Sequence, residues 1–211
     1  MPEALLIFDC DGVLVDSERL SHGVLPQMLA ELGADLSFDA TVERFIGTSV
    51  PVCLARVGEL LGGTLPEDFR SRFTQRTRDA FEAGLQPMAG VERLLAALRA
   101  PYCVASNGNR EKVEFTLGQT GLLPRFAGRV FTADDALHPK PAPDLFLHAA
   151  RSVGAAAQRS TVIEDTATGI AAAKAAGMRA IGFAATTPRA RLAAAGADAL
   201  VDAMDELAAL L

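Results

Sequence analysis

The chain is poor in the features that mark secreted, disulfide-stabilised and membrane-spanning proteins. Its 211 residues include no tryptophan, one tyrosine and only three cysteines, Cys10, Cys53 and Cys103, without CxxC spacing. An odd number of widely separated cysteines argues against a disulfide framework or a thiolate zinc site, so we interpret all three as small apolar residues. Charged residues interrupt every apolar stretch before the ~20 residues needed to cross a bilayer. We therefore expect no membrane span.

The chain also has fewer basic than acidic residues. The 20 Lys and Arg residues face 26 Asp and Glu residues, which gives a formal net charge of −6 and a pI of about 5.1. An acidic surface repels phosphate backbones, and the basic residues form no dense cluster, so we expect no nucleic-acid partner. The N-terminus lacks a basic region followed by an apolar run and a small-residue cleavage site. We expect a cytoplasmic monomer that binds any anionic substrate locally.

Short apolar runs alternate with helical patterns over most of the chain. This alternation is typical of βα units that form a parallel sheet covered on both faces. The expected strands cover residues 4–8, 102–105, 130–132, 161–163, 180–183 and 199–201. The segment 16–87 contains only helical patterns. We predict a Rossmann-like α/β core made of residues 1–15 and 88–211, with an all-helical domain of residues 16–87 inserted into it.

Carboxylates follow two of the predicted strands. The first strand runs directly into Asp9-Cys10-Asp11-Gly12, and Glu164-Asp165 follows the strand at 161–163. The carboxyl ends of parallel strands bind ligands, and glycine permits a sharp turn there. Four carboxylates in a partly desolvated crevice repel one another, and an all-oxygen cluster suits Mg²⁺. The alternatives are a solvated Asp-Gly turn for the first pair and a helix N-cap for Asp165.

Two further strand ends carry groups suited to an anionic ligand. Ser106 and Asn107 follow the strand at 102–105 and offer a hydroxyl and N–H groups at the start of a helix, as an oxyanion or phosphate site requires. Lys140 follows the strand at 130–132 and supplies a positive charge, although a surface lysine in a proline-rich loop is the alternative. We expect His138 and His148 to be loop and helix-surface residues, not ligands.

Together these segments resemble the phosphatases of the haloacid dehalogenase superfamily. The resemblance is to the branch with an inserted helical cap, which includes the β-phosphoglucomutases and phosphoglycolate phosphatases. It covers nearly the whole chain through the opening Asp-x-Asp-Gly motif, the Ser-Asn-Gly strand end, the Lys-Pro-x-Pro loop and the Glu-Asp-x-x-x-Gly segment. Residues 100–108 are most similar to bacterial sugar-phosphate phosphatases, including those that act on 6-phosphogluconate.

The resemblance implies phosphoryl transfer through an aspartyl phosphate. Asp9 is the implied nucleophile, and Asp11 is the implied general acid and base. Ser106 and Lys140 complete the implied catalytic set by binding a phosphoryl oxygen and by balancing charge. Asp11 also favours phosphatase over dehalogenase chemistry, because the family's dehalogenases lack a second acid in that role.

A phosphate-binding set and a metal site follow from the same resemblance. The residues implied to contact the phosphate are Gly12, Ser106, Asn107 and Lys140. The residues implied to hold Mg²⁺ are Asp9, Asp11 through its carbonyl, and Asp165, with Glu164 as a neighbour or an alternative ligand.

The expected function is a Mg²⁺-dependent phosphomonoester hydrolase acting on a small phosphorylated sugar or organic acid. The alternatives are a β-phosphoglucomutase-type sugar phosphomutase and a binding module without turnover. The mutases resemble Lys-Gly-Val-Ser-Arg in the cap, where this chain has Ile46-Gly47-Thr48-Ser49-Val50. Both basic positions that grip a second phosphate are absent, which favours hydrolysis. Arg44 and Arg56 remain candidates for substrate contact in the inserted domain.

Overall fold

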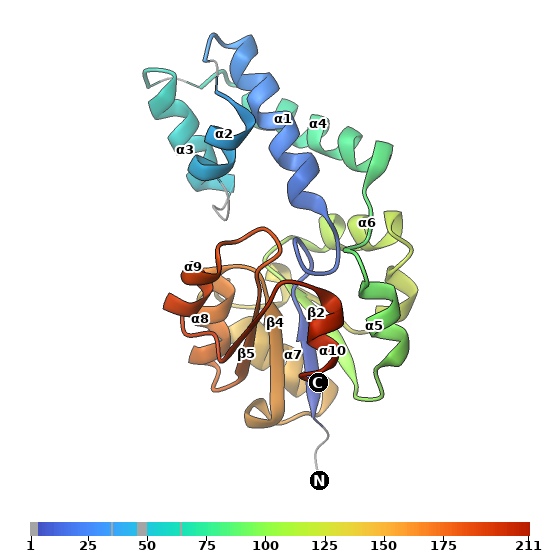
Figure 1. Cartoon of the computed structure of the whole chain (residues 1–211). Helices are drawn as coiled ribbons and strands as arrows, with labels where there is room; N and C mark the ends of the chain where they lie inside the picture. The colour runs from blue at the N-terminus through green and yellow to red at the C-terminus, as the bar shows by residue number, and fades with distance from the viewer. Residues whose placement is uncertain (1–3, 35, 46–49, 64) are drawn as a thin grey trace. The chain divides into compact units, whose positions relative to one another are not determined.

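The computed structural model describes residues 4–211 except 35, 46–49 and 64. The chain divides into two compact units, an α/β unit of residues 1–16 and 86–211 and a helical unit of residues 17–85 (Figure 1). The junctions predicted from the sequence, 15/16 and 87/88, lie within one or two residues of these boundaries. At the base of the insertion, the Asp16 N–H donates to the Gln86 carbonyl over 3.0 Å, so the outgoing and returning segments pair.

The α/β unit is built on a parallel sheet, which confirms the predicted fold class. The described strands are β1 (Leu5–Phe8), β2 (Tyr102–Ser106), β3 (Val130–Thr132), β4 (Ser160–Glu164), β5 (Arg179–Phe183) and β6 (Ala199–Val201). Their order in the sheet is β3-β2-β1-β4-β5-β6, and every adjacent pair is parallel. The central strand β1 is buried along its whole length, as its uninterrupted apolar sequence predicts for a strand covered on both faces.

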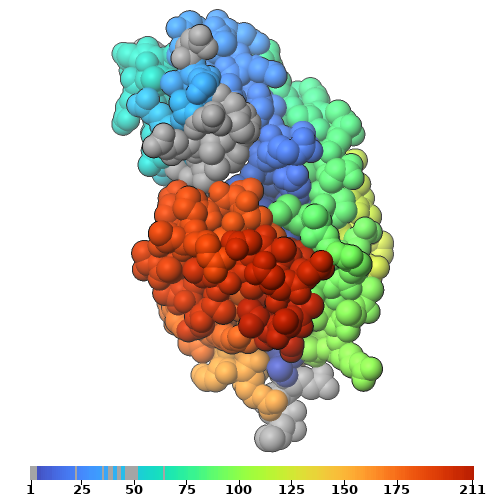
Figure 2. All heavy atoms as spheres, in the orientation of Figure 1, coloured from blue at the N-terminus to red at the C-terminus, as the bar shows by residue number. Residues whose placement is uncertain are grey.

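Helices cover both faces of this sheet. They are α5 (Val91–Ala97), α6 (Arg110–Gln119), α7 (Asp144–Val153), α8 (Ala167–Ala175), α9 (Arg189–Ala194) and α10 (Met204–Ala208). Leu5 and Ile7 of β1 share a core cluster with residues of α7 and α8, so Leu6 and Phe8 face the other side of the sheet. Figure 1 shows α10 in front of the strands and α7 behind them. In Figure 2 the C-terminal third of the chain, in orange and red, forms much of the visible surface of this unit.

The helical unit has a core of its own. Its helices are α1 (Ser17–Glu31), α2 (Phe38–Phe45), α3 (Val50–Leu60) and α4 (Phe69–Gly84). Met28 and Leu29 of α1, Phe45 of α2, Val57 of α3 and Phe69 of α4 are buried in one cluster. All four helices therefore contribute to a single apolar core. Among the residues that the structure describes, no helix has both the length and the apolar character needed to cross a membrane.

The order of the strands predicts where a ligand would bind. The chain passes from β1 to β2 and β3 on one side, then returns to place β4 on the other side of β1. This reversal is a topological switch point, where open α/β sheets bind ligands beyond the carboxyl ends of their strands. The Asp9 N–H donates to the Ile163 carbonyl over 3.0 Å, and Phe8 pairs with Ile163. The register therefore brings Asp9 beside Glu164, the last residue of β4.

Candidate active site

A tight loop after β1 presents the first acidic pair. Gly12 has φ +73°, and its N–H donates to the Val15 carbonyl over 2.9 Å. A Cβ atom at this position would collide with the carboxylate of Asp165, so only glycine allows the loop to pass so close to the end of β4. Asp9 is 7% exposed, which rules out a solvated turn as the environment of the first acid.

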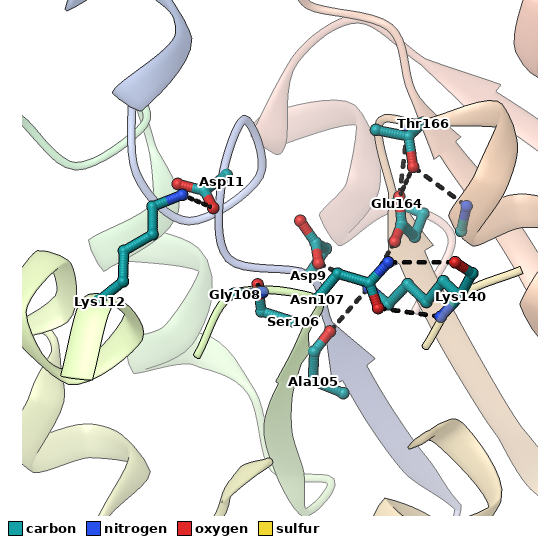
Figure 3. Close-up of polar contacts among 11 residues, drawn as sticks. Asp9, Asp11, Ala105, Ser106, Asn107, Gly108, Lys112, Lys140, Glu164 and Thr166 are labelled. Carbon is teal, nitrogen blue, oxygen red and sulfur yellow. Dashed lines mark hydrogen bonds and ion pairs between the residues drawn. The ribbon is translucent and has the colours of Figure 1, made fainter. Parts of the chain in front are cut away.

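Lys140 lies at the centre of the site. Its side chain is 3% exposed, so the alternative of a surface lysine is wrong. Its ammonium donates to Asp9 Oδ1 at 2.6 Å, to Glu164 Oε1 at 2.6 Å and to the Ala105 carbonyl at 2.8 Å (Figure 3). The Nζ atom also lies 4.7 Å from the centre of the Phe146 ring. One buried cation thus joins residues at the carboxyl ends of β1, β2 and β4.

Asn107 holds the loop that carries this lysine. Its Oδ1 accepts from the Lys140 N–H at 2.9 Å, and its Nδ2 donates to the Lys140 carbonyl at 3.2 Å. The side chain therefore acts on the position of Lys140, and the phosphate contact predicted for Asn107 would fall to its backbone. Ser106, 2% exposed at the end of β2, accepts from the Gly108 N–H at 3.2 Å through its hydroxyl oxygen.

Opposing effects act on the pKa of Asp9. Burial raises the pKa of Asp9 to about 7, the charge of Lys140 acts in the opposite direction, and the nearby Glu164 carboxylate raises it further. Burial disfavours the ammonium of Lys140, but the negative charges of Asp9 and Glu164 outweigh it and raise the pKa of Lys140 above its ordinary value. The site therefore favours the charged form of Lys140.

Glu164 is held from both sides. Its Oε1 binds Lys140, while its Oε2 accepts from the N–H and the hydroxyl of Thr166 at 3.0 and 2.8 Å. A Cβ atom on Gly169, in the first turn of α8, would overlap the Glu164 carboxylate. Thr166 and Gly169 were not predicted as site residues, although the Glu-Asp-Thr-x-x-Gly spacing carries the signal for both.

Three acids form a candidate metal centre. Asp9, Glu164 and Asp165 are all buried, and each offers a carboxylate oxygen within 4.8 Å of those of the other two. Asp165 is fully buried against the loop of Gly12. It does not cap α8, because the hydroxyl of Thr166 caps that helix by accepting from the Gly169 N–H at 3.0 Å. The N-cap alternative for Asp165 is therefore wrong, and the donor set fits a hard divalent cation.

Asp11 has a different partner from the other three acids. Its Oδ2 accepts from the ammonium of Lys112 at 2.6 Å, and its carboxylate is directed toward α6 (Figure 3). Burial acts to lower the pKa of Lys112, but the charge of Asp11 and its hydrogen bond outweigh it and raise that pKa. Lys112 is absent from the predicted site. Its position, three residues after the helix-capping Asn109, places it in the first turn of a helix at the edge of the sheet where the acids lie.

The histidines lie where the sequence indicated. His138 is exposed in the loop before α7 and lies 3.1 Å from Asp144. His148 lies on α7 with its ring edge-on to that of Phe131, 5.6 Å between centroids. Neither belongs to the cluster of buried acids found in the described part of the chain. Ile46 to Ser49 lie outside the described residues, as does the side chain of Val50.

Comparison with known proteins identifies the family. The model of the haloacid dehalogenase-like hydrolases matches residues 4–177, and the chain belongs to this family. It is 30% identical to the 6-phosphogluconate phosphatase of Escherichia coli over 85% of this chain and 82% of that protein. It is 32% identical to a plasmid-encoded phosphoglycolate phosphatase of Cupriavidus necator over 100% and 94% of the two chains. A haloacid dehalogenase-like protein from Agrobacterium tumefaciens has a similar structure, with TM-score 0.91, 35% identity and coverage of 99% and 97%. The predicted family is thereby confirmed.

Removing the buried ammonium should destabilise the α/β unit. We expect Lys140→Met to lower the free energy of unfolding by about 3–5 kcal/mol without added metal, because two buried carboxylates lose their counter-ion. The pair of changes Lys140→Met and Glu164→Gln should cost less than the sum of the single changes. Urea denaturation followed by tyrosine fluorescence reports on this unit, since Tyr102 in β2 is the only tyrosine and tryptophan is absent.

Lys174→Met is the matched control for this measurement. Lys174 makes an exposed ion pair with Asp198 at 2.7 Å, and such pairs contribute about 0–1 kcal/mol. A loss for Lys140→Met no larger than that of the control would contradict the central role given to Lys140.

Proposed function

We propose that this member of the haloacid dehalogenase-like hydrolases is a Mg²⁺-dependent phosphomonoesterase. The observation that carries the proposal is the placement of Asp9 at the switch point, bound to the buried ammonium of Lys140 and beside Glu164 and Asp165. A carboxylate nucleophile, a fixed cation and a set of metal-binding oxygens are the components that phosphoryl transfer through an acyl phosphate requires.

The proposed substrates are small phosphorylated sugars or organic acids. Support comes from the relatives, since one is a 6-phosphogluconate phosphatase and another a phosphoglycolate phosphatase. Both of those substrates are phosphorylated carboxylic acids. We assign the choice among such substrates to the inserted helical unit of residues 17–85, where the family resemblance puts the cap.

The first proposed step transfers the phosphoryl group to Asp9. A carboxylate oxygen of Asp9 attacks phosphorus in line, the bond from phosphorus to the leaving oxygen breaks, and Asp11 donates a proton to that oxygen. Lys140, bound to Asp9 Oδ1, keeps the nucleophile oriented and offsets the charge of the approaching phosphate. The Ser106 hydroxyl, at the end of the neighbouring strand β2, is assigned to a phosphoryl oxygen.

The second proposed step returns the enzyme to its starting state. Water attacks the phosphorus of the aspartyl phosphate, the bond between phosphorus and Asp9 breaks, and Asp11 accepts a proton from the water. The proton that Asp11 gave to the leaving group is thereby replaced. Inorganic phosphate is the second product.

The metal assignment rests on the donor set. Asp9, the Asp11 carbonyl and Asp165 are the proposed ligands, with Glu164 close by but already bound to Lys140 and Thr166. When bound, Mg²⁺ supplies positive charge that stabilises the transferring phosphoryl group. The three buried carboxylates support this choice, as does the glycine at position 12, which lets the loop after β1 pass close to Asp165.

Replacing the two acids of the first loop should separate their roles. Asp9→Asn removes the nucleophile, so we expect no measurable phosphate release. Asp11→Asn should lower kcat by about 10²-fold or more, the usual scale of general acid–base catalysis. Phosphate release from a panel of phosphorylated sugars and acids at saturating Mg²⁺ measures both, with circular dichroism to verify folding. Wild-type activity in Asp9→Asn would exclude the aspartyl-phosphate route.

Chelation should abolish the activity, and Mg²⁺ should restore it. Ca²⁺ should support turnover poorly, because its larger and looser coordination displaces the phosphate relative to the nucleophile. Asp165→Ala should raise the Mg²⁺ concentration that gives half-maximal activity, whereas the matched change Asp198→Ala, at an exposed site, should not. Full activity after exhaustive chelation would overturn the metal assignment.

A coupled assay distinguishes the phosphatase from the mutase. With β-glucose 1-phosphate and a bisphosphate activator, we expect free phosphate but no glucose 6-phosphate above background, because Ile46 and Val50 provide no cationic grip for a second phosphate. Glucose 6-phosphate dehydrogenase detects the isomerised product directly. Rapid, activator-dependent isomerisation with little phosphate release would favour the mutase.

A further inference from the structure

The backbone of Lys112 is fixed by the start of α6. Asn109 is the N-cap of this helix, and its side-chain oxygen accepts from the Lys112 N–H at 2.9 Å. A capped first turn has a defined backbone geometry, so the Cα–Cβ bond of Lys112 points in a set direction. The strand β2 that precedes α6 ends at Ser106, and the first turn of α6 therefore lies at the edge of the sheet that carries the site.

From this turn Lys112 reaches a residue 101 positions earlier in the chain. Its Nζ atom lies 2.6 Å from Asp11 Oδ2. The two side chains are 44% and 27% exposed, in contrast to the almost fully buried Lys140 and Asp9. Figure 3 shows two separate pairs, with Asp11 directed toward Lys112 on one side and Asp9 joined to Lys140 on the other.

The two lysines bind different acids of the site. Lys140 binds Asp9 and Glu164, while Lys112 binds Asp11, which is not part of the cluster formed by Asp9, Glu164 and Asp165 among the described residues. Asp11 lies only two residues from Asp9, and any cation in the acid cluster attracts both carboxylates. The ammonium of Lys112, on the opposite side, attracts the Asp11 carboxylate away from the cluster.

We propose that Lys112 is a positioning residue that holds the Asp11 carboxylate away from the metal-binding acids, in place to exchange protons with the leaving oxygen and with water. This inference rests on the proposed phosphatase function for its catalytic consequence. The ammonium of Lys112 has no lone pair and takes no proton, so it acts through Asp11 and not on the substrate. Arginine is the conservative replacement, since it keeps the charge and a donor of similar reach.

Two substrates with different leaving groups distinguish a positioning role of Lys112 from a purely structural role. An alkyl phosphate needs a proton on its leaving oxygen, whereas 4-nitrophenyl phosphate releases a stable anion and needs none. For Lys112→Met we expect kcat/KM for the alkyl phosphate to fall at least about 10-fold, and kcat/KM for 4-nitrophenyl phosphate to change less than about 3-fold. Because the second step still needs Asp11, nitrophenolate should appear in a burst of one per site before a slower steady state.

Two comparison variants complete the kinetic test. Lys112→Arg should recover most of the alkyl phosphate activity, and Lys174→Met, which removes an exposed lysine bound to Asp198, should leave both substrates unaffected. An equal loss on both substrates would reduce Lys112 to a structural role. A rise in KM alone would make it a substrate-binding residue. Either result, or no change, overturns the proposal.

A structural measurement separates this proposal from the proposed function. In crystals of Lys112→Met the Asp11 carboxylate should turn away from α6, while in Lys112→Arg it should stay. If the wild-type protein released no phosphate from any substrate, the proposed function would fail, and the position of Asp11 in these crystals would still decide the inference. An unmoved Asp11 carboxylate in Lys112→Met would overturn it.

Discussion

The ammonium of Lys140 is the interaction on which the site depends. It comes from the loop after β3 and binds Asp9, Glu164 and the Ala105 carbonyl, groups that belong to three adjacent segments of the sheet. Burying three charged groups is costly unless each is paired and hydrogen-bonded, and here every donor of the ammonium has an acceptor. The carboxyl ends of β1, β2 and β4 are joined through this one atom.

The fold makes this arrangement possible by bringing distant segments to one edge. The strand order places β1 between β2 and β4, so Asp9, Ser106 and Glu164 lie at the same end of neighbouring strands. Two glycines then remove the side chains that would obstruct the acids, Gly12 beside Asp165 and Gly169 beside Glu164. The carboxylates can pack closely because these two positions have no side chain, and because Lys140 offsets part of the negative charge.

Electrostatics gives the acids different characters. Asp9 and Glu164 share a buried cation, Asp165 faces the loop of Gly12, and Asp11 has a lysine of its own on α6. Residues of one chemical type, four carboxylates within two short segments, are in this way suited to different tasks. A nucleophile, a metal ligand and a proton carrier need different surroundings, which position along the chain does not provide.

The amino-acid sequence by itself determined the elements and the chemical groups of the site. The apolar runs of the strands, the helical insertion and the motif residues Asp9, Ser106, Lys140 and Asp165 are local signals, since each is visible within a few neighbouring residues. They were enough to predict the parallel sheet and the family. They also indicated which polar residues would lie at one edge of the sheet, because parallel strands end at a common edge.

Only the tertiary structure decided which groups pair. That Lys112 binds Asp11 across 101 residues, that Asn107 holds the backbone of Lys140, and that Thr166 takes the N-cap position considered for Asp165 depend on strand order and helix direction. Contacts of this kind leave no local pattern in the sequence. A lysine in a helix has the same neighbours along the chain whether its side chain faces solvent or an acid. The physical reason is that charge pairing depends on distance in space, which the fold sets and spacing along the chain does not.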